Sequence, residues 1–166
     1  AGNIGSLNGV SFIALKSPFL DPQTSVERKG VQLLTTPSIN FLMSGNNSHF
    51  ALKGIDLTGI VQIDVLAAIT TRNGALGGSV EIRLGSPTGE LLGQSEKIGI
   101  KEGGGFRPPQ GVSMIEWRRM NSNRAKVAIK PTTGVQDLYF IFKNPDVKGE
   151  EVLMGINEIE FKNKVD

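Results

Sequence analysis

The sequence of 166 residues contains no cysteine, one histidine, one tryptophan and one tyrosine. Without cysteine the chain has no disulfide, no thiolate zinc site and no cysteine nucleophile. A Ser-His-Asp triad would have to use His49, and no Gly-x-Ser-x-Gly motif is present to supply its serine. The phosphate-binding motif Gly-x-x-x-x-Gly-Lys-Ser/Thr is missing too. These absences argue against the common classes of hydrolase and nucleotide-binding enzyme.

The sequence also lacks a large excess of charge of one sign and has no long hydrophobic run. Lys and Arg total 18 and Asp and Glu total 16, so the net charge is +2. So small an excess of positive charge argues against a nucleic-acid partner. No apolar run approaches the roughly 18 residues that a membrane-spanning helix needs. We therefore expect neither nucleic-acid binding nor membrane insertion.

The main pattern in the sequence is an alternation of apolar and polar residues. In residues 61–68, Val61, Ile63 and Val65 alternate with Gln62 and Asp64. A period of two is the mark of a half-buried strand. Residues 79–84 repeat this pattern, and the glycine-rich residues 71–78 between the two segments predict a hairpin loop.

The same pattern predicts strands along most of the chain and no long helix. The predicted strands are residues 10–15, 31–35, 39–44, 50–53, 61–68, 79–84, 91–98, 124–130, 137–143 and 153–161. Their spacing of about 8–12 residues is typical of an all-β, two-sheet β-sandwich. We expect at most one helical turn, near residues 146–152. Residues 18–163 should form this single domain, preceded by residues 1–17 as a first strand or as a segment derived in part from expression.

Two stretches invite a functional interpretation. Residues 99–113 form a long irregular segment in which Phe106 stands among glycines and prolines, and segments of this kind are often functional or flexible. Glu158 and Glu160 share one face of the last predicted strand and could lie at the separation of about 5–9 Å that glycosidases need. Such alternation is more typical of a solvated strand face than of a catalytic pair.

Four segments carry a resemblance to a known family: residues 56–60, 77–93, 133–142 and 156–161. Together they resemble the family 6 carbohydrate-binding modules. The resemblance implies a β-jelly-roll with a sugar-binding cleft formed by loops at one end, where aromatic rings stack on the sugar and an asparagine bonds its hydroxyls. Asn144 occupies the asparagine's place, whereas Met43 and His49 stand where the family has aromatic residues.

The resemblance also implies a structural calcium ion, with Asp21 and Asn157 at the comparable positions. For the sugar we predict hydrogen bonds from Asn46, His49 and Asn144, and stacking by Phe106 or Trp117. Trp117 alternates with charged neighbours, so a buried strand residue is the other interpretation. Phe106 could instead close one end of the sandwich.

Three functions follow as hypotheses. The leading one is a non-catalytic carbohydrate-binding module of a larger secreted or periplasmic protein, with a glycan and the other domains of its own chain as partners. The second is a structural or protein-docking sandwich that has lost the sugar site, which Met43 and His49 favour. The third is a glycoside hydrolase, which needs two acidic residues facing one cleft.

Overall fold

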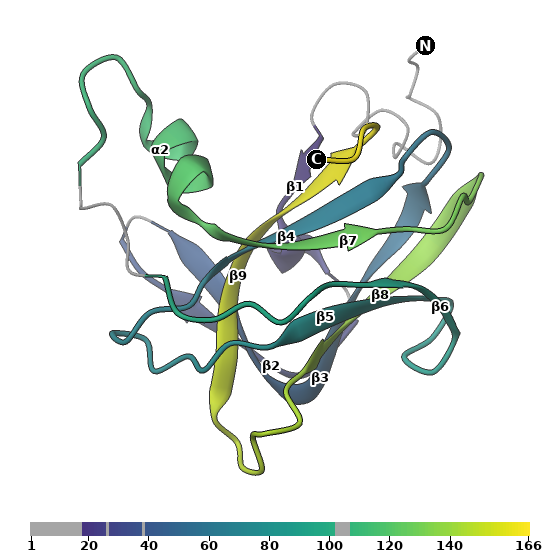
Figure 1. Cartoon of the computed structure of the whole chain (residues 1–166), viewed down its shortest axis with the longest axis horizontal. Coiled ribbons are helices and arrows are strands. Elements are labelled where there is room, and N and C mark those ends of the chain that lie inside the picture. Colours follow the sequence, from purple (N-terminus) through teal and green to yellow (C-terminus); the bar gives the residue numbers. More distant parts are fainter. Residues whose placement is uncertain (1–17, 26, 38, 102–106) are drawn as a thin grey trace.

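The computed structural model describes residues 18–25, 27–37, 39–101 and 107–166 (Figure 1). Strands make up most of this part of the chain, with one short α-helix and one 3-10 turn. In chain order the elements are β1 (Phe19–Leu20), η1 (Pro22–Thr24), β2 (Glu27–Thr35), β3 (Asn40–Asp56), β4 (Gln62–Ala68), β5 (Ser79–Leu84), β6 (Glu90–Gln94), α2 (Met114–Asn121), β7 (Asn123–Ala128), β8 (Val135–Lys143) and β9 (Val152–Lys162).

All strand pairs are antiparallel, in the order β6-β5-β8-β3-β9-β4-β7, with β1 beside β9 and β2 beside β3. The two ends of this sheet approach each other, because the Lys130 amide after β7 donates to the Leu92 carbonyl of β6 at 3.0 Å. The sheet is therefore nearly closed into a barrel with two facing layers (Figure 1). The predicted all-β sandwich is confirmed.

Strand β3 belongs to both layers because it bends at a large bulge. Residues 42–45 pair with β9, whereas residues 49–56 pair with β8. Across from Gly30 of β2, four residues of β3 (45–48) have no partner on β2, since Lys29 pairs with His49 and Val31 pairs with Ser44. Asn47 in this bulge has φ 64°, a left-handed value that asparagine tolerates better than most residues. The two strands predicted at 39–44 and 50–53 are thus one bent strand.

The core lies between the two layers and follows the alternation seen in the sequence. Ile63 and Val65 of β4 are fully buried. Phe50 stacks on Phe140 and Phe142, with ring centroids 4.9 and 5.8 Å away. Burial of each such ring contributes roughly 1.5–3 kcal/mol. Strand β8 is buried on both faces from residue 138 to 142, as its continuous apolar run predicts.

The helix predictions were wrong in two places. Residues 146–152 form a turn and a bend, not a helical turn, and the strand β9 begins at Val152. The helix is α2, on residues for which no helix was predicted and where the alternation around Trp117 had suggested a strand. Ser113 and Glu116 form a capping box, with Ser113 Oγ accepting from the Glu116 amide and Glu116 Oε2 accepting from the Ser113 amide, both at 3.1 Å. This box satisfies donors that the first turn leaves free.

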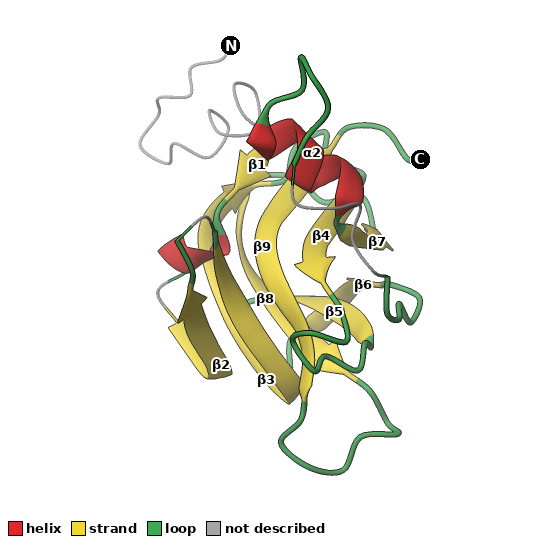
Figure 2. Cartoon of the chain, turned by 90° about the vertical axis from the view of Figure 1, so that its left-hand side faces the viewer, coloured by secondary structure: helices red, strands yellow, loops and turns green. Residues whose placement is uncertain are grey.

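Helix α2 lies at one end of the molecule, and the loop between β8 and β9 lies at the other end (Figure 2). No helix in the part of the chain that the structure describes is long and apolar enough to cross a membrane. The strand predicted at residues 10–15 lies outside the described residues.

Candidate functional site

A groove of about 410 Å³ lies at the end of the molecule formed by the bend in β3. Three segments surround it: the start of β2, the bulge of β3, and the loop between β8 and β9 (residues 144–151). The residues that line it are Lys29, Gly30, Gln32, Met43, Gly45, Asn46, Asn47, Ser48, Gly149, Glu150 and Val152. We refer to it as the bulge groove.

Two asparagines hold the rim of the bulge groove together. Asn46 Oδ1 accepts from the Asn144 amide at 2.9 Å, and Asn46 Nδ2 donates to the Val147 carbonyl at 2.9 Å. Asn144 is 3 % exposed, and its side chain accepts from the Asp146 amide at 3.0 Å and donates to the Gly77 carbonyl at 2.9 Å. The sequence predicted that these two amides belong to one site, and the structure brings them together. Because Asn144 is buried and satisfied, it positions the loops around the groove.

Gly77 and Gly78 allow the loop between β4 and β5 to approach this asparagine pair. Gly77 has φ 83°, and a Cβ there would lie 2.3 Å from the Ile98 carbonyl oxygen. A Cβ on Gly78 would lie 2.5 Å from the Lys143 carbonyl oxygen. Only glycine fits both places, so this Gly-Gly pair fixes the loop against β8.

The described residues that line the bulge groove are of mixed chemistry, mostly polar and without an aromatic ring. Met43 supplies a flexible apolar surface. Gln32, Asn47 and Ser48 supply hydrogen-bonding groups, and Ser48 Oγ also closes the bulge by donating to the Gly45 carbonyl at 2.7 Å. Glu150 is the single carboxylate of the lining. Glycoside hydrolysis needs two, so the groove suits binding and not catalysis.

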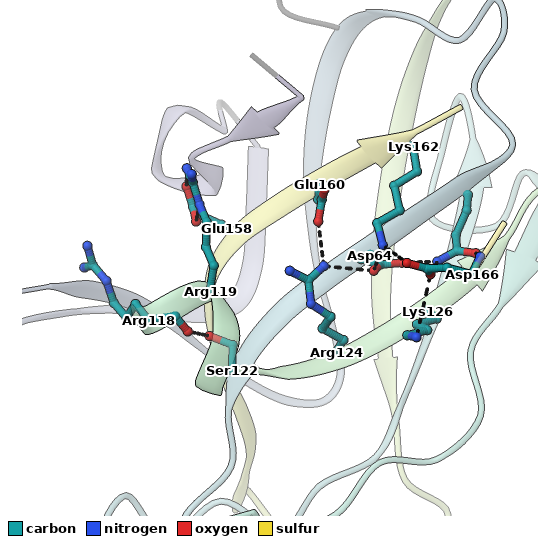
Figure 3. A network of polar contacts seen from close by, with 11 residues as sticks. Asp64, Arg118, Arg119, Ser122, Arg124, Lys126, Glu158, Glu160, Lys162 and Asp166 are labelled. Atoms are coloured by element: carbon teal, nitrogen blue, oxygen red, sulfur yellow. Dashed lines mark hydrogen bonds and ion pairs between the residues drawn. The ribbon is translucent and has the colours of Figure 1, made fainter. Parts of the chain in front are cut away.

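The carboxylates considered as a catalytic pair are engaged elsewhere. Glu158 accepts two hydrogen bonds of 2.8 Å from Arg119. Glu160 accepts from Arg124 at 2.5 Å. Both lie among ion pairs on the outer face of β9 (Figure 3). These contacts agree with a structural strand face.

Asp64 is the centre of that ion-pair network. Its side chain has no exposed surface, and it contacts Arg124 at 3.0 Å and Lys162 at 3.2 Å. Burial alone would lower the pKa of Arg124, but its hydrogen bonds to Glu160 and Asp64 outweigh burial and raise it. Asp166 closes the network by accepting from Lys162 and Gln62, and these hydrogen bonds lower its pKa to about 2 (Figure 3).

His49 lies outside the bulge groove, on the outer face of the sheet beside β8. It is 8 % exposed, and its ring centroid is 5.8 Å from that of Tyr139. Its Nε2 lies 3.7 Å from Glu27, which also accepts from the Tyr139 hydroxyl at 2.9 Å. That hydrogen bond and a second one from Lys53 lower the pKa of Glu27. The structure therefore separates His49 from Asn46 and Asn144.

Trp117 also lies away from the groove, because α2 occupies the opposite end of the molecule (Figure 2). Its side chain is half-buried on a helix that has no fully buried residue. The expectation that Trp117 is a buried strand residue was wrong, and the capping box is the physical reason. Phe106 lies outside the described residues.

Asp21 and Asn157, the residues expected near a calcium ion, line one small pocket between η1, β3, α2 and β9. Asp21 caps η1, and its two carboxylate oxygens accept from the Gln23 amide at 2.8 Å and from Gln23 Nε2 at 3.0 Å. Calcium prefers six to eight oxygen ligands, several of them carboxylates. Arg118 and Arg119 line the same pocket, and the described residues contain no group of three acidic or histidine side chains that could hold a metal. The pocket therefore fits a calcium ion poorly.

Compared by sequence, the chain matches no family model and no curated protein. Its fold is similar to several solved structures. A family 6 carbohydrate-binding module from Clostridium cellulolyticum, in complex with xylose, has a TM-score of 0.64 and 21 % identity, covering 87 % of this chain and 95 % of that one. A β-1,3-glucan-binding module of family 6 from Bacillus halodurans gives the same TM-score and identity, covering 87 % and 94 %.

A family 43 arabinoxylan arabinofuranohydrolase from Bacillus subtilis, in complex with cellotetraose, is similar over one part only. It has a TM-score of 0.61 and 18 % identity, covering 88 % of this chain and 27 % of the enzyme. Identities this low establish the fold and leave the ligand open. The resemblance predicted from the sequence is confirmed at that level: the chain has the fold of the family 6 carbohydrate-binding modules.

Proposed function

We propose that this domain is a non-catalytic carbohydrate-binding module that holds a glycan in the bulge groove. The observation that carries the proposal is the groove itself, which has hydrogen-bonding side chains around Met43 and only one carboxylate. Sugar hydroxyls need fixed polar partners, and the C–H faces of sugar rings need an apolar surface. The shared fold with modules solved with xylose or named for binding a glucan supports the same conclusion.

In this proposal the side chains of the groove divide into two roles. Gln32, Asn47 and Ser48 bond the hydroxyls, while Met43 packs against the ring. Asn46 and Asn144 keep the loops in place, as their intramolecular bonds indicate. His49 contacts the glycan only if the bound polysaccharide extends over the bulge of β3 toward β8. Because no aromatic ring lines the groove, we expect weak binding of a short segment.

We further propose that the module serves a larger secreted or periplasmic protein. The hydrolase from Bacillus subtilis supports this, since this fold accounts for about a quarter of that chain. The module would then hold the enzyme near its polysaccharide without taking part in the reaction.

Affinity gels test the proposed binding with a panel of soluble polysaccharides that includes xylan, β-1,3-glucan and mixed-linkage glucan. The variants are Gln32→Ala and Met43→Ala in the groove, with Glu96→Ala, an exposed position outside it, as the matched control. We expect retardation by at least one polysaccharide, reduced by both groove variants and unchanged in the control. Retardation that both groove variants leave unchanged would place binding elsewhere.

The groove's lack of an aromatic ring also favours a second function, a structural or protein-docking sandwich. No retardation by any member of the panel, from a chain whose unfolding is cooperative, would support that function and exclude the first.

A further inference from the structure

A second pocket lies at the far end of the molecule from the bulge groove, beside α2. It has a volume of about 180 Å³ and is formed by η1, the start of β3 and residues from both ends of α2, closed by β9. We call it the α2 pocket. It shares no lining residue with the bulge groove. A ligand here would therefore bind independently of the proposed polysaccharide site.

One residue that lines the α2 pocket has a buried acceptor without a partner among the described residues. Asn157 of β9 is 9 % exposed, and its Oδ1 makes no hydrogen bond to any residue that the structure describes. Buried polar atoms in native proteins are nearly always bonded, so an unpaired one requires an explanation. Asn157 lines the pocket, but this oxygen has almost no accessible surface, so a ligand donor reaches it only when the Asn157 amide turns toward the pocket.

The charges around the α2 pocket cancel. Asp21 and Glu158 supply two carboxylates, and Arg118 and Arg119 supply two guanidinium groups. The guanidinium groups would repel a bound cation, and the carboxylate of Asp21 would repel a bound anion. A neutral ligand avoids both penalties. Hydroxyl groups suit this lining well, because each can donate to a carboxylate or an amide oxygen and accept from a guanidinium group.

Part of the lining is held in place before any ligand binds. Arg119 bonds Glu158 through two contacts of 2.8 Å and lies 3.5 Å from the ring centroid of Phe19. On β3, Asn40 Nδ2 donates to Gln23 Oε1 at 3.0 Å. Fixed polar groups lose little conformational freedom on binding, which favours a small ligand.

Size and apolar surface narrow the class of ligand. The α2 pocket, at about 180 Å³, has room for one sugar ring and not for a polysaccharide chain. Ile39 and Ile115 add apolar surface to the polar lining. Ile115 is 51 % exposed on α2, so it stands at the mouth of the pocket.

We propose that the α2 pocket binds a single neutral sugar unit or a polyol of similar size, and that the side-chain amide of Asn157 turns to accept from one of its hydroxyls through Oδ1. The charge-balanced lining selects neutral sugars over uronic acids and over metal ions. This proposal goes beyond polysaccharide binding in the bulge groove, and either can be correct without the other.

Two-dimensional NMR titration of the full chain tests the proposal. The probes are xylose, glucose, galactose and arabinose, with glucuronate and calcium chloride as charged comparisons. We expect at least one neutral sugar to shift the amide signals of α2 and of residues around Asn157. Asn157→Leu should weaken this binding about tenfold, and Ile115→Ala, on an exposed helix face, should weaken it without a cost in folding. Met43→Ala, in the bulge groove, should leave it unchanged.

Several results would overturn the proposal. One is the absence of shifts near α2 with all four neutral sugars. Others are tighter binding of glucuronate than of any neutral sugar, and calcium-dependent shifts at Asn157 without sugar-dependent ones. If Asn157→Leu does not fold, Ile115→Ala and Asn40→Ala provide the same test. Loss of sugar binding in Met43→Ala but in neither of these two would assign the sugar to the bulge groove alone.

Discussion

The two ends of this sandwich are held together by different chemistry. Beside the bulge groove, neutral amides join the loops: Asn46 and Asn144 bond backbone atoms of the two loops after β4 and β8. On the outer face of β4, β7 and β9, near α2, ion pairs between charged side chains join the strands instead. Asp64, Arg124 and Lys162 lie at the centre of these ion pairs (Figure 3). Each set joins segments that are far apart in the sequence.

This difference between amide and charged contacts predicts which property of the domain each network controls. A rim made of amides and backbone carbonyls keeps its geometry over a wide range of pH and salt. The charged face depends on complete pairing, because a buried carboxylate that loses its partner is strongly unfavourable. We therefore expect the charged network to matter most for stability, and the amide network to matter most for the shape of the groove.

The largest effect is expected from Asp64→Ala. This change removes the buried carboxylate that Arg124 and Lys162 share and leaves each with one acidic partner, so the free energy of unfolding should fall by about 3 kcal/mol. Urea unfolding followed by tryptophan fluorescence measures it. Asp146→Ala is the control, because its ion pair with Lys97 is largely exposed and should change stability by less than about 0.5 kcal/mol. Equal losses in the two variants would show that the buried network is not stabilising.

A smaller loss of stability is expected from Asn144→Ala at the other end. Removal of this side chain leaves the Gly77 carbonyl and the Asp146 amide without their partners, which should cost about 2 kcal/mol. Hydrogen exchange at Gly77 and Val147 should also become faster, because both loops lose their common anchor. Asn163→Ala, at an exposed position, is the control. Unchanged exchange in the loops would contradict the role assigned to Asn144.

Strands could be predicted well from the sequence because alternation is local. The predicted strand 79–84 coincides with β5, and the apolar run in β8 correctly indicated burial on both faces. Helix α2 was missed because eight residues are too few to show a helical period. The signal that could have found it was the Ser113 and Glu116 capping box.

The site could be predicted only in part, because its geometry depends on contacts between distant segments. Asn144 and the pairing of Asp21 with Asn157 were found through the family resemblance, whereas Asn46 was predicted separately as a hydrogen-bonding residue of the same site. Gln32 and Glu150 were missed, since nothing in their local sequence shows that β2 and the loop after β8 meet. Alternation placed Asp64 on an outward face, but it could not reveal that Arg124 and Lys162 cover that face.

The shape of the bulge in β3 can be altered through Asn47. Its φ of 64° is unfavourable for β-branched residues, so Asn47→Val should cost about 1–2 kcal/mol, whereas Asn47→Gly should be close to neutral. Thermal unfolding of the two variants measures this difference. If Asn47→Val matches Asn47→Gly, the left-handed conformation is not required for the bulge. Polysaccharide retardation by the folded Asn47→Val variant would then show how far binding depends on this geometry.

The smallest effect concerns the pH dependence of the charged end. Asp166 accepts from Lys162 and Gln62, which lowers its pKa from the ordinary 3.8 to about 2. A carboxylate with a lowered pKa stabilises the folded state above its unfolded pKa, and this contribution is lost as the pH falls from about 4 to 2. Carbon NMR of the Asp166 carboxyl should therefore show a midpoint near 2, and Lys162→Met should move it toward 3.8. Because Asp166 is about half exposed, the change in overall stability should be small. A midpoint near 3.8 in the unmodified chain would mean that the C-terminal residues do not hold to β4 in solution, and that Asp64 depends on Arg124 and Lys162 alone.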